Sequence, residues 1–415
     1  MSIIARAGLE PVEPATSNNE AARKTDSPSD ATHAKARGIW RIDTLKTAAD
    51  IRKHAYQWLD LERRSADPNA AFQGYVWCEA WLSVYCRPDS GIEPRVFFIY
   101  FADTLVAVLP MMVQSHMGAR VLTNLGEPHS QLANALCDVT VDCTDGLRLC
   151  ISQAALLAQA DVMALGPLPA RSPLVAVLGH DVLTPDPAEY ISLIEWPTST
   201  TSESYLQSLS KNKRKTFNKK YRRLTELGEV EFKRLGPQDT GFRPAIEQAL
   251  KLKREWLRRE GLYSLGLTYT DVDQFLTSFV AHDGAFHIEA ETVHVDGSVL
   301  SICINLVGNG VRHCYLSAYD DALAEHSPGT IGHQISVQHT IDDSLQAYSF
   351  LGYPTRYKAV WSNAQEPLLR YQLALNAKGA TWLRCWTNGL RPLAKRLMTV
   401  GKGVMRLLNG ARIAR

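Results

Sequence analysis

The feature that most constrains this 415-residue sequence is a series of three apolar segments with strong β propensity, separated by very short turns. The turns are Asp296-Gly297 and Gly308-Asn309-Gly310, and the segments are AFHIEAETVHV, SVLSICINLV and VRHCYLSAY. Gly, Asn and Asp tolerate the left-handed backbone that tight hairpins need, so turns of this kind join antiparallel neighbours. The sequence therefore predicts a three-stranded antiparallel meander over residues 285–319.

A helix start follows the meander. Ser327 suits the N-cap position and Pro328 the first helical position, so we expect a helix from Ser327 to about Gln346. The start of a helix presents free backbone N–H groups and a positive dipole end, which together favour phosphate, and Gly329 lets a ligand approach the backbone closely. Simple caps share this pattern, so both a phosphate site and a plain cap remain open.

The remaining patterns predict an α/β (α+β) protein with two domains. Residues 50–64 have the apolar spacing of a helix, and RVFFIYF with TLVAVLPMMVQ predicts a β-hairpin. The start of the chain is rich in Pro, Ser and charged residues, which is typical of a disordered leader rather than a signal peptide. We therefore expect a leader at 1–38, a first domain at 39–199, a second domain at 200–375 and a basic tail at 376–415.

Basic charge is concentrated in two places. The formal net charge is +2, yet residues 201–230 carry +5 and residues 384–415 carry +8, which leaves −11 for the rest of the chain. The first cluster, KNKRKTFNKKYRRL from Lys211, has the spacing of an amphipathic helix with a basic outer face. A solvated face is the simplest interpretation. Nucleic-acid binding is disfavoured, because the body of the chain is acidic and Phe217 and Tyr221 lie on the apolar side.

The eight cysteines contain no CxxC pair and have no His-rich partner segment, so the spacing supports neither a zinc site nor a disulfide framework. The sequence is typical of a reducing cytoplasm, and no metal is expected. The most apolar later window, around residues 147–165, is interrupted by Arg148, Gln153, Gln159 and Asp161. No segment reaches the roughly 20 apolar residues that a membrane-spanning helix needs.

Three motifs occur in a family-specific order: KNKRKTFNKKYRRLTELGEVEF, YLSAYDDALAEHSPGTIG and YSFLGYPTRYKAVWS. In these motifs the chain resembles the acetyltransferase-like proteins of the GNAT superfamily that occur with bacterial cellulose and exopolysaccharide biosynthesis, which are themselves similar to the Fem-type aminoacyl transferases. The resemblance covers residues 200–372 well and the first domain loosely. It implies two tandem GNAT-like domains, each a mainly antiparallel mixed sheet flanked by helices, with acyl-CoA (acetyl-CoA) as co-substrate.

The sequence departs from the family at three positions. The phosphate loop R/Q-x-x-G-x-G/A corresponds to His326–Ile331, where only Gly329 is in register. Ser349 stands where the family often has an acidic residue, and Tyr353-Pro354 replaces a Gly-Asp pair. The Y-K-x-x-W motif is matched by Tyr357, Lys358 and Trp361.

These patterns give a set of candidate site residues. Tyr357 is the leading candidate for the catalytic acid, His313 is a candidate base, and Tyr319 shares its strand face by period-2 alternation. A buried phenol and a structural histidine are the plain alternatives. The expected acyl-CoA contacts are Ser327, Gly329, Thr330 and Lys358. The expected substrate contacts are Lys211, Arg214 and Lys215, which would face phosphates, and Asp320. Asp320 would orient the acceptor or merely form a turn.

The predicted function is an acyl-CoA-dependent N- or O-acyltransferase that acts on a surface-polysaccharide or cell-envelope precursor. Residues 384–415 form a predicted basic amphipathic helix that can lie on the inner face of the membrane, join a polysaccharide-synthase complex or dock on the protein itself. Two alternatives remain. One is a catalytically degenerate GNAT-fold adaptor in such a complex, and the other is a Fem-like transferase that uses charged tRNA.

Overall fold

A computed structural model describes residues 39–179, 183–352 and 355–386, and the described residues from Trp40 onward form one compact unit. We call residues 40–199 the first half and residues 200–386 the second half. The elements of the first half are β1 (Trp40–Leu45), α1 (Ala48–Lys53), α2 (Ala55–Arg64), η1 (Pro68–Gln73), α3 (Tyr75–Tyr85), β2 (Ile92–Phe101), β3 (Thr104–His116), β4 (Ala119–Asn124), β5 (Leu136–Cys137), α4 (Thr144–Leu157), β6 (Val162–Pro169), α5 (Pro173–Val177) and β7 (Leu183–Glu195).

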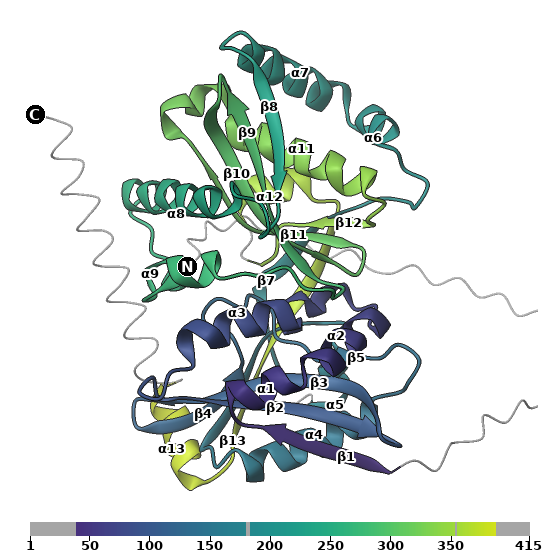
Figure 1. Ribbon diagram of the computed structural model, residues 1–415, viewed down its shortest axis with the longest axis vertical. Helices are drawn as coiled ribbons and strands as arrows, with labels where there is room; N and C mark the ends of the chain where they lie inside the picture. The colour runs from purple at the N-terminus through teal and green to yellow at the C-terminus, as the bar shows by residue number, and fades with distance from the viewer. Residues whose placement is uncertain (1–38, 180–182, 353–354, 387–415) are drawn as a thin grey trace, which may run out of the picture. The chain divides into compact units, whose positions relative to one another are not determined.

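The second half begins with two helices and continues through the meander to the long strand β13 (Figure 1). Its elements are α6 (Ser202–Ser208), α7 (Lys211–Thr225), β8 (Val230–Leu235), α8 (Phe242–Arg259), α9 (Leu265–Thr268), α10 (Val272–Thr277), β9 (His287–Val295), β10 (Ser298–Gly308), β11 (Val311–Tyr319), η3 (Asp321–His326), α11 (Pro328–Asp342), β12 (Ala347–Ser349), α12 (Arg356–Trp361), β13 (Ala364–Ala374) and α13 (Ala377–Cys385).

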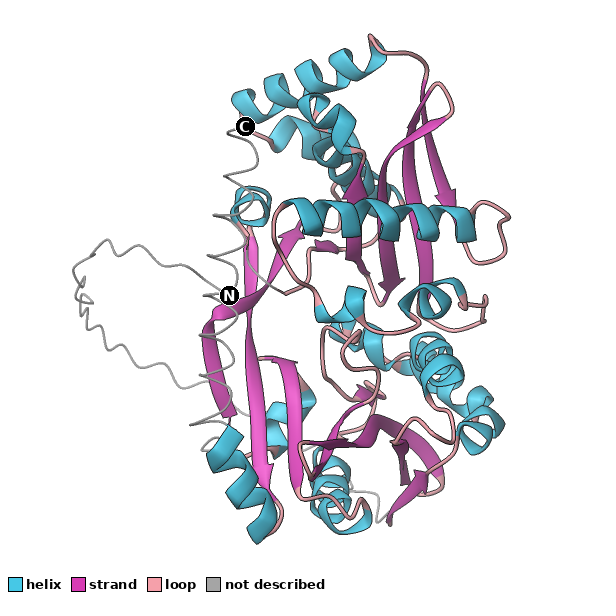
Figure 2. Cartoon of the chain, turned by 90° about the vertical axis from the view of Figure 1, so that its left-hand side faces the viewer, coloured by secondary structure: helices cyan, strands magenta, loops and turns pink. Residues whose placement is uncertain are grey.

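One mixed, mainly antiparallel sheet runs through both halves. Its strand order is β1-β2-β3-β4-β6-β13-β7-β12-β11-β10-β9-β8, and β5 pairs with β3. The parallel pairs are β4 with β6 and β11 with β12. Helices flank the strands of each half, as Figure 2 shows. The predicted α/β class with a mainly antiparallel mixed sheet is confirmed.

The two halves exchange strands at the centre of this sheet. β13 comes late in the chain, yet it pairs antiparallel with β6 along one edge and with β7 along the other. β7 in turn pairs with β12 of the second half, where Glu195 lies opposite Ala347. In Figure 1 the yellow of β13 therefore lies among strands of the first half. The sheet of the first half is completed by β13, a strand near the end of the second half.

The predicted meander is confirmed as β9, β10 and β11. Both of its turns contain left-handed residues, with φ of 46° at Asp296 and 73° at Gly297, and 47° at Asn309 and 79° at Gly310. Such pairs match the twist of two-residue hairpins. The basic run forms α7 as expected, with the Ser210 side chain accepting the Lys213 N–H at 3.3 Å as an N-cap.

Large aromatic side chains pack the two halves against each other. Trp77 of α3 is fully buried, and its ring contacts Phe275 and Tyr315 of the second half at centroid distances of 5.0 and 5.1 Å. The buried Glu62 accepts backbone N–H groups from Tyr75 and from Ala285. Side-chain and backbone contacts thus join α2 and α3 to the segment that leads into β9.

Helices α8 and α11 pack against the strands of the meander, α8 mainly on β11 and α11 on β10 and β11. In the part of the chain that the structure describes, no helix combines the length and the apolar character that crossing a membrane requires. The tail predicted to be amphipathic lies mostly at residues 387–415, outside the described residues.

Candidate active site

A pocket opens where β11 and β12 part. These strands pair in parallel over three residue pairs, from Val311 with Ala347 to His313 with Ser349, while β11 continues to Tyr319. The pocket, which we call the wedge pocket, has a volume of about 350 Å³. Residues from β11, α8, α11 and α12 line it, among them Ser317, Tyr319, Lys253, Gly329, His333 and Tyr357.

The first turn of α11 forms one wall of the wedge pocket. Ser327 is left-handed, with φ of 56°, and its side chain makes no cap hydrogen bond; instead its carbonyl accepts the Thr330 N–H at 3.0 Å. The expected side-chain cap at Ser327 is therefore absent, although the helix does begin at Pro328. A Cβ added at Gly329 would lie 3.1 Å from the Tyr319 ring, so only glycine fits this approach without displacing the ring.

His333 lies one turn further along α11, and its ring stacks on that of Tyr357 with a centroid distance of 5.9 Å and an interplanar angle of 22°. Its Nδ1 lies 3.0 Å from the Tyr348 hydroxyl. Desolvation raises the pKa of Tyr357, and a hydrogen bond with Ser317 opposes that shift. Because 44% of Tyr357 is exposed, solvent moderates this shift, but the phenol is protonated at neutral pH either way. Tyr357 is therefore available as a proton donor.

The opposite wall comes from α8. The Lys253 Nζ lies 4.4 Å from the centre of the Trp256 ring, a cation–π contact, and burial lowers the pKa of Lys253. Both residues line the wedge pocket. An aromatic face and a cation therefore stand across the pocket from the start of α11.

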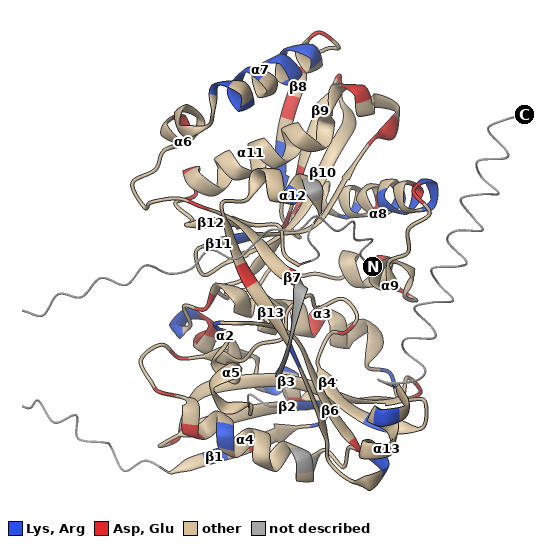
Figure 3. Ribbon diagram, turned by 180° about the vertical axis from the view of Figure 1, so that it is seen from behind, with Lys and Arg blue, Asp and Glu red and all other residues tan. Residues whose placement is uncertain are grey.

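A second pocket, of about 320 Å³, adjoins the first and shares Thr330 and Trp361 with it. We call it the lysine pocket, because Lys213 and Lys220 of α7 line it. Lys220 Nζ lies 3.2 Å from Thr330 Oγ1, and burial lowers the pKa of Lys220. Gln334 also lines it, and its buried Nε2 has no hydrogen-bond partner within the described part of the chain. Figure 3 shows the concentration of basic residues along α7.

The basic residues predicted to contact substrate lie elsewhere on α7. Lys211 and Lys215 are exposed, and Arg214 donates a hydrogen bond to the Gln207 carbonyl. These three are not among the residues that line the lysine pocket, whereas Lys213 and Lys220 are. Asp320 is likewise outside the wedge pocket, since it caps η3 by accepting the Ala322 N–H at 2.9 Å.

Two other predicted site residues have structural partners. His313 has no exposed surface, and its Nε2–H donates to the Pro68 carbonyl at 2.7 Å; burial lowers the pKa of His313 to about 4. It does not line the wedge pocket, because η1 of the first half covers its end of β11. Lys358 donates to the carbonyls of Phe350 and Gly352, both at 2.8 Å, and burial lowers the pKa of Lys358 to about 8.

The structure thus brings together five of the predicted residues around the wedge pocket: Tyr357, Tyr319, Ser327, Gly329 and Thr330. Sequence patterns missed His333, Lys253 and Trp256 there, and Lys213 and Lys220 in the lysine pocket. For His333 a signal was present, because it follows Gly329 by one helical turn and so lies on the same face of α11.

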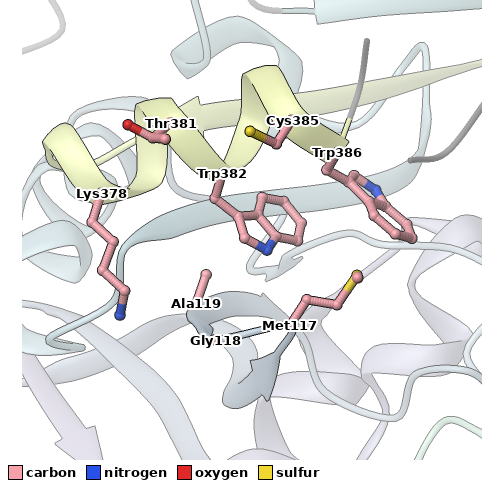
Figure 4. A pocket seen from close by; sticks show the side chains of 8 residues that line it. All are labelled: Met117, Gly118, Ala119, Lys378, Thr381, Trp382, Cys385 and Trp386. Carbon is pink, nitrogen blue, oxygen red and sulfur yellow. The ribbon is translucent and has the colours of Figure 1, made fainter. Parts of the chain in front are cut away.

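A third pocket, of about 440 Å³, lies against α13 (Figure 4). The rings of Trp382 and Trp386 stack there with centroids 5.8 Å apart, facing Met117, which is 58% exposed. Trp382 Nε1 also donates to the His116 carbonyl at 3.1 Å. This apolar surface includes the last described residues, which belong to the tail predicted at 376–415.

Comparison with known proteins agrees with this geometry. Residues 211–359, from α7 through most of α12, match the family model of the acetyltransferase (GNAT) domain. None of the curated proteins searched matches the sequence.

Two solved structures show the same fold. The C-terminal DUF2156 domain of a protein assigned as a lysylphosphatidylglycerol synthetase from Agrobacterium fabrum is 13% identical, with a TM-score of 0.50 over 80% of this chain and 93% of that chain. FemX is 11% identical, with a TM-score of 0.53 over 78% of this chain and 96% of that chain. Residues 211–359 therefore match an acetyltransferase (GNAT) domain, as predicted, and the two structures show a shared fold.

Proposed function

We propose that the chain transfers an acyl group from acyl-CoA to a saccharide or cell-envelope acceptor. The observation that carries this proposal is that the two pockets adjoin and share Thr330 and Trp361 in their linings. The thioester end of acyl-CoA fits the wedge pocket beside Tyr357. Its phosphates fit the first turn of α11 with Lys213 and Lys220 beside it, where amide groups, helix dipole and lysine charge favour anions together.

The unpartnered Nε2 of Gln334 also supports a ligand in the lysine pocket. A buried amide without a partner is costly, and a hydrogen-bond acceptor on the ligand, such as an amide carbonyl or a phosphate oxygen, would satisfy it. The residues present therefore fit the acyl-CoA that the domain match implies.

Acyl transfer needs a proton removed from the acceptor and a proton given to the departing thiolate. In our proposal an amine or hydroxyl of the acceptor attacks the thioester carbon, the C–S bond breaks, and the Tyr357 hydroxyl protonates the sulfur of CoA. His333 accepts the acceptor proton at Nε2 in the tautomer whose Nδ1–H donates to the Tyr348 oxygen. The products are the acylated acceptor and free CoA.

The acceptor side of the wedge pocket is the α8 wall. Lys253 lies over the ring of Trp256 and suits a phosphate or carboxylate on the acceptor. This cation supports an anionic acceptor, which is consistent with a surface-polysaccharide or cell-envelope precursor. We place the reaction in the cytoplasm at the membrane periphery, in the setting of cellulose or exopolysaccharide synthesis that the sequence motifs indicate.

The test is calorimetric titration of the full chain with acetyl-CoA, followed by assay of free CoA thiol with candidate acceptors. Binding of acyl-CoA and acceptor-dependent thiol release would support the proposal. Failure to bind acyl-CoA of any chain length would refute it.

Fem-like aminoacyl transfer is the second candidate, because the fold is shared with FemX. Fem-like transfer predicts a product that forms only with charged tRNA. Release of CoA thiol from acyl-CoA and acceptor without tRNA would exclude Fem-like transfer as the principal activity.

A degenerate adaptor is the third candidate, favoured by the buried Ser349 at the family's acidic position. In that case Tyr357→Phe and Gly329→Glu would leave function intact in cells, whereas deletion of residues 384–415 would abolish it.

A further inference from the structure

Three soft metal-binding side chains meet beneath the wedge pocket. Cys303 of β10, Cys314 of β11 and His333 of α11 are all buried, and one ligand atom from each lies within 4.8 Å of the others. The Cys303 Sγ is 4.0 Å from the His333 Nδ1. We call this group the Cys₂His cluster. Neither cysteine is in a disulfide.

Tyr348 supplies a fourth donor. Its hydroxyl lies 3.0 Å from His333 Nδ1, the same nitrogen that faces the sulfur of Cys303, and it also interacts with Cys314. Four donor atoms from β10, β11, β12 and α11 therefore converge on one point. The adjoining side chains include the apolar Val337 and Phe350, and the buried Glu291 acts electrostatically on Cys303 and Tyr348. Buried thiolate and imidazole donors are typical of structural zinc sites.

The spacing is close to that of tetrahedral zinc. Bonds of about 2.3 Å to sulfur and about 2.1 Å to nitrogen put sulfur and nitrogen about 3.6 Å apart and two sulfurs about 3.8 Å apart. The observed 4.0 Å between Cys303 and His333 is within about 0.4 Å of that separation. The other two separations within the cluster are at most 4.8 Å, so binding requires the donor atoms to approach one another by about 1 Å.

His333 lines the wedge pocket and also belongs to the cluster, so the two sites share this side chain. We propose that Cys303, Cys314, His333 and Tyr348 form a site for Zn²⁺ or a similar soft divalent cation. Cysteine sulfurs bind as thiolates, so the ion displaces two thiol protons to solvent and binds His333 through Nδ1.

Regulation by this site rests on the proposed function, in which His333 is the base. An imidazole that binds a metal through Nδ1 carries its remaining proton on Nε2 and cannot accept another. His333 would then no longer serve as the base. Zinc bound in the cluster would therefore inhibit acyl transfer, and a chelator would restore it.

The binding test does not depend on catalysis. Tag-free full-length protein, reduced and stripped with a chelator, is titrated with Co²⁺, which reports tetrahedral thiolate ligation by a thiolate-to-cobalt charge-transfer band and intense visible absorption. We expect one equivalent of Co²⁺ to give both signals and one equivalent of Zn²⁺ to abolish them.

The matched variants are Cys303→Ala, Cys314→Ala and, as control, Cys150→Ala, which removes a fully buried cysteine from the core of the first half. Both cluster variants should lose the charge-transfer band and bind Co²⁺ at least tenfold more weakly, whereas the control should retain both the band and the affinity. Circular dichroism checks that each variant is folded. A wild-type protein without the band, or a band that persists in both cluster variants, would overturn the site. Acyl-CoA binding, measured separately by calorimetry, distinguishes that outcome from failure of the proposed function.

Discussion

At the residue scale the two neighbouring lysines of α7 give the clearest test of the phosphate position. Lys220 contacts Thr330 at the start of α11, whereas Lys219, the preceding residue, is exposed. Lys220→Gln should weaken acetyl-CoA binding about tenfold, and the loss should shrink at high salt because part of the interaction is electrostatic. Calorimetry at two salt concentrations checks this. Lys219→Gln removes the same charge and should change affinity less than twofold.

Tyr357 gives a second residue-scale prediction. Tyr357→Phe removes the hydroxyl that protonates the leaving thiolate but keeps the ring that stacks on His333. We expect kcat to fall about a hundredfold with little change in KM for acyl-CoA, since general acid catalysis is typically worth at least that much. Tyr263→Phe, at an exposed tyrosine outside the pocket, is the control. An unchanged kcat in Tyr357→Phe would exclude it as the acid.

Single residues also show which positions in the pocket local sequence patterns can predict and which they cannot. Gly329, Thr330 and Tyr357 were predictable because motif spacing and helix-start chemistry are local. His313 was placed correctly on one strand face, but alternation says nothing about what covers the strand. That cover is the Pro68 carbonyl, 245 residues earlier in the chain. Lys253 was unpredictable for the same reason, because only packing brings α8 to the pocket.

At the element scale, α7 has two basic sets that differ in position but not in charge. Lys213 and Lys220 line the lysine pocket, and Lys211 and Lys215 are exposed outside it. A double Lys→Gln change removes two charges in either case, so long-range electrostatics are matched. We expect the Lys213/Lys220 pair to weaken acyl-CoA binding at least tenfold more than the Lys211/Lys215 pair. A larger loss of affinity in the Lys211/Lys215 pair would instead support the phosphate contact at Lys211 and Lys215 that the sequence first predicted.

The contact of α2 with the segment before β9 should make stability depend on pH. Burial raises the pKa of Glu62 from 4.5 to about 7, and the backbone N–H groups that it accepts oppose the shift. The folded state thus favours the protonated form of Glu62. The stability that protonated Glu62 contributes is therefore complete below pH about 4.5 and is lost as the pH rises through 7.

Replacement by glutamine tests that direction. Glu62→Gln is neutral at every pH, so its free energy of unfolding relative to wild type should rise by about 2 to 3 kcal/mol between pH 4.5 and pH 8. Urea unfolding at both pH values measures it. Glu247→Gln, at an exposed position of α8, is the control and should show no such trend. If the difference in free energy of unfolding between Glu62→Gln and wild type did not change with pH, the raised pKa of Glu62 would be contradicted.

At the scale of the whole molecule, the sequence predicted two domains in tandem, whereas the pairing of β13 with β6 and β7 makes them share one sheet. Hydrophobic periodicity predicted β2, β3 and the meander but neither β7 nor β13, and it could not predict this exchange, because strand partners depend on tertiary packing. With Trp77 packed against Phe275, we expect a single calorimetric unfolding transition for the chain. Two separated transitions would show that the halves unfold independently.

The place of β13 also bears on how the protein is made. A nascent chain that has been synthesised as far as β7 still lacks the strand that separates β6 from β7, and that strand is made only after β8 to β12. Domains usually fold one after another on the ribosome. Here the sheet of the first half keeps an open edge until β13 has emerged, so the first half is completed only after most strands of the second half have been made.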